Sequence, residues 1–327
     1  MPTKTLIETI HDTLGDEMAR DERVFIIGED VGKMGGVFRV TDGLQSEFGP
    51  MRVIDSPLAE LSIVGIAIGA AAVGLRPIAE IEFADFIYAA FDQIVSEAAK
   101  MRYRSNGTWT CPLVIRAPYG GGIHGALYHS QSIEAFFCHV PGLKVVAPAT
   151  PYDAKGLLLA AIRDPDPVLF LEHKKLYRAI KGEVPDGDYT IPIGKAEVKR
   201  AGTDISVITY GAMLHETLAA AEELARDGIE IEVVDLRTLQ PLDKETILAS
   251  ARKTSKVCII HEDSKTMGLG AEIAALISDE AFIDLDAPIK RVTGPDLPGI
   301  PFNDAGERAY LPNQEKIAQA LRDLAAF

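Results

Sequence analysis

The chain has few cysteines and no CxxC pair. Its three cysteines, Cys111, Cys138 and Cys258, lie far apart in the sequence, which argues against a disulfide framework and against a zinc site. This cysteine usage is typical of a reducing compartment, and we expect a cytoplasmic protein. No stretch of about 18 unbroken apolar residues is present, and residues 1–6 lack the apolar run of a signal peptide. The sequence therefore predicts neither a membrane span nor a secretory leader.

Basic residues are also scarce relative to acidic ones. The chain has 33 Lys and Arg against 48 Asp and Glu, which gives a formal net charge of −15. A surplus of negative charge argues against nucleic acid and anionic membranes as partners. It is compatible with a basic protein partner, and it is equally compatible with a role in solubility alone.

The composition is that of a globular protein with a large core. Of 327 residues, 47% are hydrophobic and 25% charged, and the length predicts about two domains. Apolar runs alternate with helical patterns, which indicates α/β domains with parallel sheets. We predict a doubly wound domain over 1–175, a linker over 176–192 and a smaller three-layer α/β domain over 193–327. The expected strands are 24–28, 52–54, 78–83, 113–117, 143–147, 168–172, 205–210, 230–235, 257–261 and 289–293. The expected helices are 5–20, 58–73, 86–104, 132–138, 151–163, 214–226, 244–251, 270–277 and 314–324.

One predicted helix carries a carboxylate in its first turn and is otherwise made of Gly, Ala, Ile and Val. Ser56 is expected to be its N-cap and Pro57 its first residue. Because the helix is small and apolar on all sides, we expect it to be buried on several sides. Glu60, in the first turn of this helix, either complements the helix dipole or is an acid–base group that exchanges a proton.

Other polar side chains follow the predicted strands, where open α/β sheets bind their ligands. Any one of these residues could be an ordinary turn or cap residue, so we predict a site from the number of such residues that follow strands. They are Glu29 and Asp30, Asp55 and Glu60, Asp85 and Phe86, and the segment 119–129.

The segment Tyr119–Gly125 is rich in glycine and matches G-x-G-x-x-G after a strand, which is a signature of dinucleotide binding. Two features count against that reading: no helix begins promptly after Gly125, and 147–149 is Ala-Pro-Ala where a ribose-binding acid would stand. A metal at His124 and His129 lacks a third ligand with recognisable spacing. A histidine in such a loop either takes part in acid–base chemistry or forms hydrogen bonds with the loop backbone. For His124 we favour a ring that hydrogen-bonds the loop backbone.

Ordered motifs along nearly the whole chain resemble one enzyme family. They are Gly28-Glu-Asp-Val-Gly32, Gly35-Gly-Val-Phe38, Asp55-Ser-Pro-Leu-Ala-Glu60, Glu82-Phe-Ala-Asp-Phe86, Arg102-Tyr-Arg-Ser105, Tyr128-His-Ser-Gln-Ser132, Pro141-Gly-Leu-Lys-Val-Val146, Asp235-Leu-Arg-Thr238 and Asp286-Ala-Pro288. The family comprises the beta subunits of the thiamine-diphosphate-dependent decarboxylase (E1) component of 2-oxo acid dehydrogenase complexes. The stretch 124–137 is most similar to the branched-chain 2-oxo acid members.

This resemblance implies a transketolase-like pyrimidine-binding domain followed by a transketolase C-terminal domain. It also implies roles for individual residues. Glu60 would hydrogen-bond the aminopyrimidine ring of the cofactor, and Phe86 would stack on it. Glu29 would lie on a buried path between two active sites, and His129 would assist acyl transfer to a lipoyl group.

A turn of alternating acids and prolines, Asp164-Pro165-Asp166-Pro167, is by itself either a cation ligand or a solvated turn. The resemblance implies a structural potassium ion. Its ligands would be Leu113, Ala161, Ile162, Asp164 and Asp166.

One motif of thiamine-diphosphate enzymes is missing. They hold magnesium and the diphosphate through Gly-Asp-Gly and a later Asn, because a hard cation prefers oxygen ligands. The nearest match here is Gly187-Asp188-Tyr189, in the predicted linker. The resemblance therefore implies that an alpha subunit holds the diphosphate and magnesium in an alpha2-beta2 heterotetramer.

The activity implied is oxidative decarboxylation of a 2-oxo acid, an oxidoreductase reaction with the lipoyl disulfide as acceptor. The expected partner is the acyltransferase component, through its lipoyl and peripheral-subunit-binding domains. Two alternatives stay open: a pyruvate or acetoin dehydrogenase beta subunit, and a non-catalytic docking subunit. The C-terminal segment 324–327 and the acidic surface are compatible with docking, whereas Glu60 and His129 favour catalysis.

Overall fold

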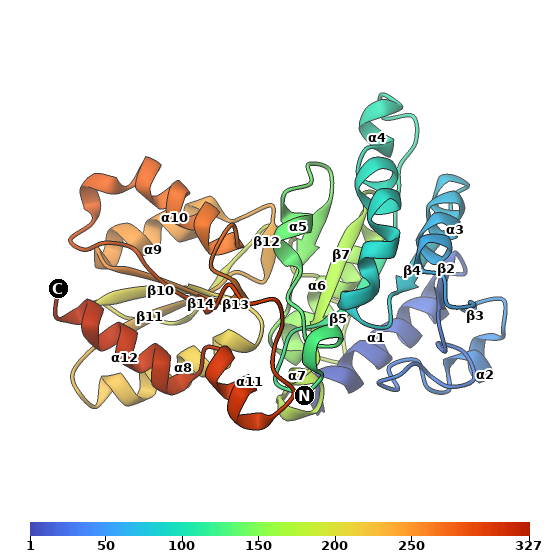
Figure 1. Ribbon diagram of the computed structural model, residues 1–327. Helices are drawn as coiled ribbons and strands as arrows, with labels where there is room; N and C mark the ends of the chain where they lie inside the picture. The colour runs from blue at the N-terminus through green and yellow to red at the C-terminus, as the bar shows by residue number, and fades with distance from the viewer. The chain divides into compact units, whose positions relative to one another are not determined.

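The computed structural model describes residues 1–327, and the chain divides into two compact units (Figure 1). Unit 1 comprises Met1–Tyr119 and Phe136–Ile193, and unit 2 comprises Gly120–Ala135 and Gly194–Phe327. The units therefore differ from the contiguous domains that we predict. The glycine-rich segment belongs with the C-terminal unit, and the predicted linker belongs with the N-terminal one. No helix is long and apolar enough to cross a membrane.

Unit 1 is built on a parallel sheet with the strand order β6-β7-β5-β4-β2-β3. These strands are almost continuously apolar because both faces of such a sheet are covered. The α/β class that we predict is confirmed. The strands are β2 (Val24–Gly28), β3 (Val53–Asp55), β4 (Arg76–Glu80), β5 (Val114–Tyr119), β6 (Lys144–Val146) and β7 (Val168–His173). The α-helices are α1 (Leu6–Arg20), α2 (Leu44–Phe48), α3 (Glu60–Ala72), α4 (Met101–Arg104), α6 (Pro151–Arg163) and α7 (Leu176–Ala179), and α5 (Glu134–Cys138) lies at the boundary of the two units.

Two predictions for unit 1 are wrong. The predicted linker contains α7 and a short strand, β8 (Lys181–Glu183), which pairs antiparallel with β1 (Thr3–Thr5) from the start of the chain. The predicted helix 86–104 is irregular: a 3-10 helix η1 (Ala84–Ala90), a π-helix η2 (Gln93–Ala98) and then α4. Because η1 and η2 pack against α3, tertiary packing overrides the regular helical pattern here.

A buried charge network lies inside the unit 1 sheet. The Arg116 guanidinium donates from Nε and Nη2 to both oxygens of Glu172 (2.6 and 2.8 Å) and from Nη1 to Glu80. The Tyr177 hydroxyl donates to Glu172 at 2.6 Å. Burial raises the pKa of Glu80, although the Arg116 charge opposes the rise. The network links the end of β4 to the neighbouring strand β5 and, through Arg116, to β7 on the far side of β5.

Unit 2 is a three-layer domain around a second sheet. Its strand order is β14-β13-β10-β11-β9, parallel except for the edge strand β9. Helices α9 and α10 cover one face and α8 and α12 the other (Figure 1). The elements are β9 (Glu197–Arg200), β10 (Ile205–Thr209), α8 (Ala212–Ala225), β11 (Ile231–Asp235), β12 (Thr238–Gln240), α9 (Lys244–Thr254), β13 (Val257–Ser264), α10 (Leu269–Glu280), η4 (Phe282–Asp284), β14 (Lys290–Gly294), α11 (Asp304–Tyr310) and α12 (Gln314–Ala325).

Candidate functional site

Four carboxylates gather at the carboxyl ends of the adjacent strands β3, β2 and β4. Burial, followed by the charges of Asp30 and Glu60, raises the pKa of Glu29. Burial, followed by the charges of Glu29 and Asp30 and a smaller effect of Glu60, raises the pKa of Glu82. Glu29 and Asp30 follow β2, Glu60 follows β3 and Glu82 follows β4, so the four carboxyl groups come from strand ends at one edge of the sheet. We call Glu29, Asp30, Glu60 and Glu82 the acidic cluster.

Glu60 is the first residue of α3, and Ala59 is the N-cap, without a side-chain cap bond. The prediction that Ser56 caps the helix and Pro57 begins it is wrong. The Ser56 backbone N–H instead donates to the carbonyl of Gly28 (2.8 Å), which ties the connection to β2. The Glu60 carboxylate therefore lies in the first turn of a helix whose N-cap side chain accepts no backbone N–H, where the helix dipole favours negative charge.

The helix that carries Glu60 was predicted to be buried on several sides, and the structure leaves one of its faces exposed. Leu61, Ile66 and Val73 are 52%, 54% and 80% exposed. A Cβ atom added at Gly69 would meet no other atom within 4 Å. A Cβ atom added at Gly65 would meet only the Gln93 side chain. We call Leu61, Gly65, Ile66, Gly69 and Val73 the open face of α3. An apolar helical face left in water is typical of a protein interface.

The loop after β2 is fixed by close backbone contacts. The Gly32 N–H donates to Asp55 Oδ1 at 2.6 Å, and an added Cβ at this glycine would overlap the Asp55 carboxylate. A Cβ at Gly28 would lie 2.7 Å from Val31 Cγ1 and 2.9 Å from the carbonyl oxygen of Glu80. Glycine is therefore required at both positions. Asp55, at the end of β3, holds the segment that presents Glu29.

The aromatic ring of Phe86 belongs to a chain of ring contacts in unit 1. Phe86 lies 5.8 Å from Phe83, Phe83 lies 5.4 Å from Phe38, and Phe38 lies 5.2 Å from Tyr177. Ring pairs at these distances contribute roughly 0.5–1.5 kcal/mol beyond the area that they bury. Phe86 is therefore held in place while its side chain stays half-buried.

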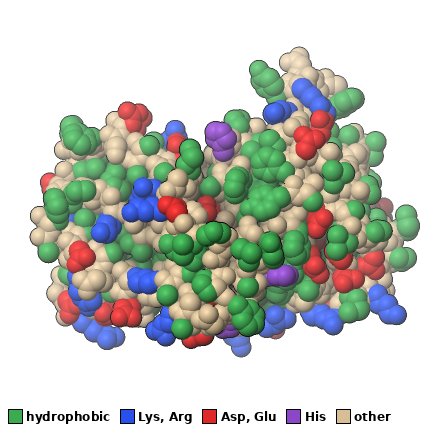
Figure 2. Space-filling view, viewed as in Figure 1, with side chains coloured by type: hydrophobic (Ala, Val, Ile, Leu, Met, Phe, Trp, Pro, Cys, Tyr) green, Lys and Arg blue, Asp and Glu red, His purple; other side chains and the backbone are tan.

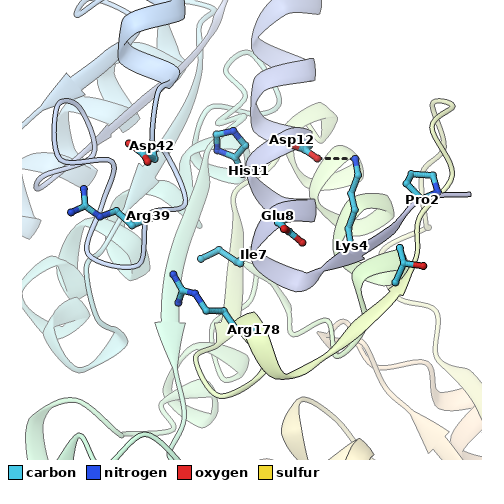
Figure 3. A pocket seen from close by; sticks show the side chains of 10 residues that line it. Pro2, Lys4, Ile7, Glu8, His11, Asp12, Arg39, Asp42 and Arg178 are labelled. Atoms are coloured by element: carbon cyan, nitrogen blue, oxygen red, sulfur yellow. Dashed lines mark ion pairs between the residues drawn. The ribbon is translucent and has the colours of Figure 1, made fainter.

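A cleft of about 560 Å³ lies beside the N-terminal half of α1 (Figure 3). None of the predicted site residues lines it. Lys4 pairs with Asp12 at 2.7 Å. His11 Nδ1 bonds the Val40 carbonyl at 2.8 Å, and Arg178 donates to the Phe38 carbonyl at 3.0 Å. Of the cleft residues, Arg178 therefore holds the backbone of Phe38, which packs against the Phe83 ring next to Phe86.

In unit 2, residues 120–132 form a loop that contains the 3-10 turn η3 (Ala126–Tyr128); we call it the glycine-rich loop. His129 follows η3 and is half-buried. A Cβ at Gly125 would lie 2.6 Å from the carbonyl oxygen of His129 and 2.8 Å from its Cβ. The glycine at 125 thus lets the chain fold back onto His129. Of the predicted residues, Glu29, Glu60 and Phe86 lie in unit 1, and His129 lies in unit 2.

His124 is anchored by a side chain and not by loop backbone, contrary to our preference. Its Nδ1 lies 2.7 Å from Glu307 Oε2, and the same carboxylate accepts the N–H groups of Gly122 and His124. His124 and Ala126 have φ values of 57° and 55°. Such left-handed conformations cost non-glycine residues roughly 1–3 kcal/mol each. Glu307 offsets this strain. No sequence signal pointed to it, because it lies more than 180 residues away from the loop.

A second missed carboxyl, Glu134, lies at the end of the same segment. It is fully buried, and its Oε1 accepts the Tyr210 hydroxyl at 2.7 Å. Burial, with the nearby Asp263 charge, raises its pKa to about 8. Glu134 therefore carries a proton at neutral pH, and unit 2 holds it as a neutral acid.

This raised pKa predicts a pH dependence of stability. The folded protein keeps the Glu134 proton up to about pH 8, whereas the unfolded chain releases it near its ordinary value of 4.5. The stabilisation is therefore present below pH 4.5 and is lost as the pH rises toward 8, at roughly 1 kcal/mol per pH unit. We expect Glu134→Gln to flatten this slope in urea unfolding curves between about pH 5 and pH 8, and the exposed Glu315→Gln to leave it unchanged. An unchanged slope in Glu134→Gln would contradict the assignment.

The predicted potassium ligands lie around the turn after α6, and protein cations already contact them. Lys144 Nζ lies 2.6 Å from Asp164, and Arg102 lies 2.9 Å from Asp166. The Ile162 carbonyl accepts a hydrogen bond from Arg76 at 2.7 Å. Carbonyl oxygens have a second lone pair that could still face a cation. The potassium site, which includes Leu113 and Ala161, stays a prediction.

Comparisons with known proteins agree along the whole chain. The family described as "Transketolase, pyrimidine binding domain" matches residues 3–180, and "Transketolase, C-terminal domain" matches residues 194–317. The chain is 59% identical to the 2-oxoisovalerate dehydrogenase subunit beta of Bacillus subtilis (strain 168). It is 52% identical to the pyruvate dehydrogenase E1 component subunit beta of the same strain. Both alignments span 327 residues and 100% of each chain. A solved structure described as "Split gene transketolase, inactive beta4 tetramer" superposes with a TM-score of 0.79 at 25% identity, over 98% of each chain.

Proposed function

Because the chain belongs to the beta subunits of the E1 components of 2-oxo acid dehydrogenases, thiamine-diphosphate enzymes with a lipoyl acceptor, we propose that it supplies the pyrimidine-binding half of that cofactor site. Together with an alpha subunit it decarboxylates a branched-chain 2-oxo acid and acylates a lipoyl group. The observation that carries this proposal is the acidic cluster, in which Glu60 begins an apolar helix beside Glu29 and Glu82.

The residues of unit 1 fit the aminopyrimidine end of thiamine diphosphate. When bound, this cofactor supplies the carbanion that attacks the ketone of the substrate. The Glu60 carboxylate, in the first turn of α3, is proposed to hydrogen-bond a nitrogen of the aminopyrimidine ring. Glu29, whose pKa is raised by burial, is suited to keep a proton nearby. The half-buried Phe86 ring offers a face for stacking.

His129 is proposed to assist the transfer of the acyl unit to the lipoyl group. An imidazole ring can donate a hydrogen bond or proton from one nitrogen and accept one at the other, which suits a group that assists the transfer. The tight turn at Gly125 fixes the backbone from which the ring projects.

The diphosphate and magnesium are proposed to lie mainly on the alpha subunit of an alpha2-beta2 assembly. The chain has no Gly-Asp-Gly motif, and no group of three or more His, Cys, Asp or Glu side chains could hold a metal ion. The open face of α3 is proposed as part of the contact with another subunit, since it is apolar and adjoins Glu60. Hydrophobic side chains reach the surface elsewhere too (Figure 2), but those of the open face of α3 share a helix with Glu60.

A charge on the open face of α3 should prevent assembly. We expect Ile66→Asp to weaken binding of the alpha subunit by roughly 2–5 kcal/mol, because an unpaired carboxylate would be buried at the contact. Sedimentation of mixed subunits at several concentrations measures this loss. Ile283→Asp, at a residue that is 92% exposed in unit 2, is the matched control and should assemble normally. Normal assembly of Ile66→Asp would remove this face from the interface.

The branched-chain substrate is proposed from two facts: the higher identity to the 2-oxoisovalerate relative and the sequence of 124–137. The test is reconstitution with an alpha subunit, thiamine diphosphate and magnesium, with an artificial electron acceptor. The value of kcat/KM should be highest for a branched-chain acid among a panel of 2-oxo acids. A preference for pyruvate would favour the pyruvate dehydrogenase alternative. No turnover of any 2-oxo acid would support a docking subunit without catalysis.

The acyltransferase component is the proposed further partner. The net charge of −15 suits a basic peripheral-subunit-binding domain. The lipoyl domain of the same component would receive the acyl group.

A further inference from the structure

Glu307 is a buried carboxylate that directs both of its oxygens at the glycine-rich loop. Its Oε1 accepts the Gly122 N–H at 2.8 Å and the His124 N–H at 3.3 Å. Its Oε2 lies 3.3 Å from the same His124 nitrogen and 2.7 Å from His124 Nδ1. Hydrogen bonds to a charged acceptor are stronger than neutral ones. One side chain therefore fixes three donors of the loop.

The helix that carries Glu307 is itself well anchored. The Asn303 side chain caps α11 by accepting the Gly306 N–H at 2.7 Å. The loop also packs on the segment that precedes α11: an added Cβ at Gly121 would lie 3.0 Å from Ile300 Cδ1, and one at Gly299 would overlap the Leu127 side chain. The carboxylate thus has a fixed base from which to hold the loop.

The anchored part of the loop leads directly to His129. His124 and Ala126 both have positive φ, so the turn between them needs outside support to keep its shape. Gly125, between the two, lies against the backbone and Cβ of His129. A shift at His124 would therefore move the backbone that presents the His129 ring.

We propose that Glu307 is a positioning residue, which holds the glycine-rich loop so that His129 meets the acyl acceptor. The inference rests on the proposed function, because it assigns Glu307 to the lipoyl acylation step. A residue that only stabilised unit 2 would affect every activity equally. A positioning residue for His129 affects acyl transfer more than decarboxylation.

Rates of Glu307→Gln in the alpha–beta assembly test the proposal. We expect acylation of a lipoyl domain to fall at least tenfold while turnover with an artificial electron acceptor stays within about threefold. His129→Ala should likewise lose more acylation of the lipoyl domain than turnover with the artificial acceptor. The double variant should acylate the lipoyl domain no more slowly than His129→Ala alone. The exposed Glu315→Gln is the control and should leave both rates unchanged. Equal losses in the two assays, or additive losses in the double variant, would overturn the proposal.

A second measurement does not depend on activity. Hydrogen exchange of residues 120–132 should speed up at least tenfold in Glu307→Gln, while exchange in α12 stays unchanged. His124→Ala, at a side chain that is 51% exposed, should give a smaller increase even if the Glu307 variant folds poorly. Unchanged exchange in both variants would overturn the proposal. Absence of turnover in the unmodified assembly would instead refute the proposed function, and the exchange result would still decide whether Glu307 holds the loop.

Discussion

Replacing Glu60 with Gln should reduce turnover of the reconstituted enzyme by about 10²- to 10⁴-fold, the usual contribution of a positioned acid or base. Gln keeps the size of the side chain but cannot exchange a proton at the cofactor ring. The substitution also removes one negative charge from the acidic cluster. Since the Glu60 charge contributes to the raised pKa of Glu29 and of Glu82, both values should fall. Dye-linked decarboxylation with the alpha subunit and saturating cofactor measures the loss.

The alternative role of Glu60, a simple complement to the helix dipole, has its own control. Glu47 is an exposed glutamate in the first turn of α2. Glu47→Gln and Glu60→Gln should change stability by similar small amounts, about 0.3–1 kcal/mol. Only Glu60→Gln should lose turnover while the alpha–beta assembly persists. Near-normal turnover in Glu60→Gln would refute the catalytic assignment.

Replacing Arg116 with Met should cost about 3–5 kcal/mol of unfolding free energy, because Glu80 and Glu172 would lose the cation that compensates their burial. All three side chains are at most 5% exposed. The loss is measured as the shift of the first transition in urea, followed by circular dichroism. Adding Glu80→Gln and Glu172→Gln to the variant should restore part of the stability, since the uncompensated charges are then gone.

The matched control is Arg104→Met. Arg104 pairs with Glu97 at 2.7 Å, but the two side chains are 48% and 38% exposed. Exposed pairs contribute about 0–1 kcal/mol, so this variant should unfold almost like the unmodified chain. If Arg116→Met were no less stable than Arg104→Met, the network would not be a determinant of the unit 1 fold.

Local patterns were sufficient to predict most strands and helices of the two units, but not the edge strand β9 of the unit 2 sheet. The strand Val24–Gly28 and the helix Pro151–Arg163 were predicted to the residue, because each has a distinct apolar pattern with clear start or stop signals. The start of α3 was misplaced because Ser56 bonds the neighbouring strand, a contact that no local rule contains. Likewise β8 is a strand only because β1 pairs with it from the other end of unit 1.

The candidate site was predictable where residues follow neighbouring strands. Parallel strands place their carboxyl ends at one edge, so Glu29 and Glu60 could be expected to meet. The supports of the glycine-rich loop were not predictable in this way. Glu307 contacts the loop from a distant part of the chain, Glu134 contacts the distant Tyr210, and the sequence neighbours of both glutamates carry no recognisable motif.

The open face of α3 and Glu60 share one short, rigid helix. In the lone chain this helix leaves Glu60 half-exposed. A partner seated on Leu61 and Ile66 would change the surroundings of Glu60, because these residues lie within two turns of it. The proposed role of Glu60 would therefore depend on subunit pairing, because the partner that covers the open face of α3 would also complete the surroundings of this carboxylate.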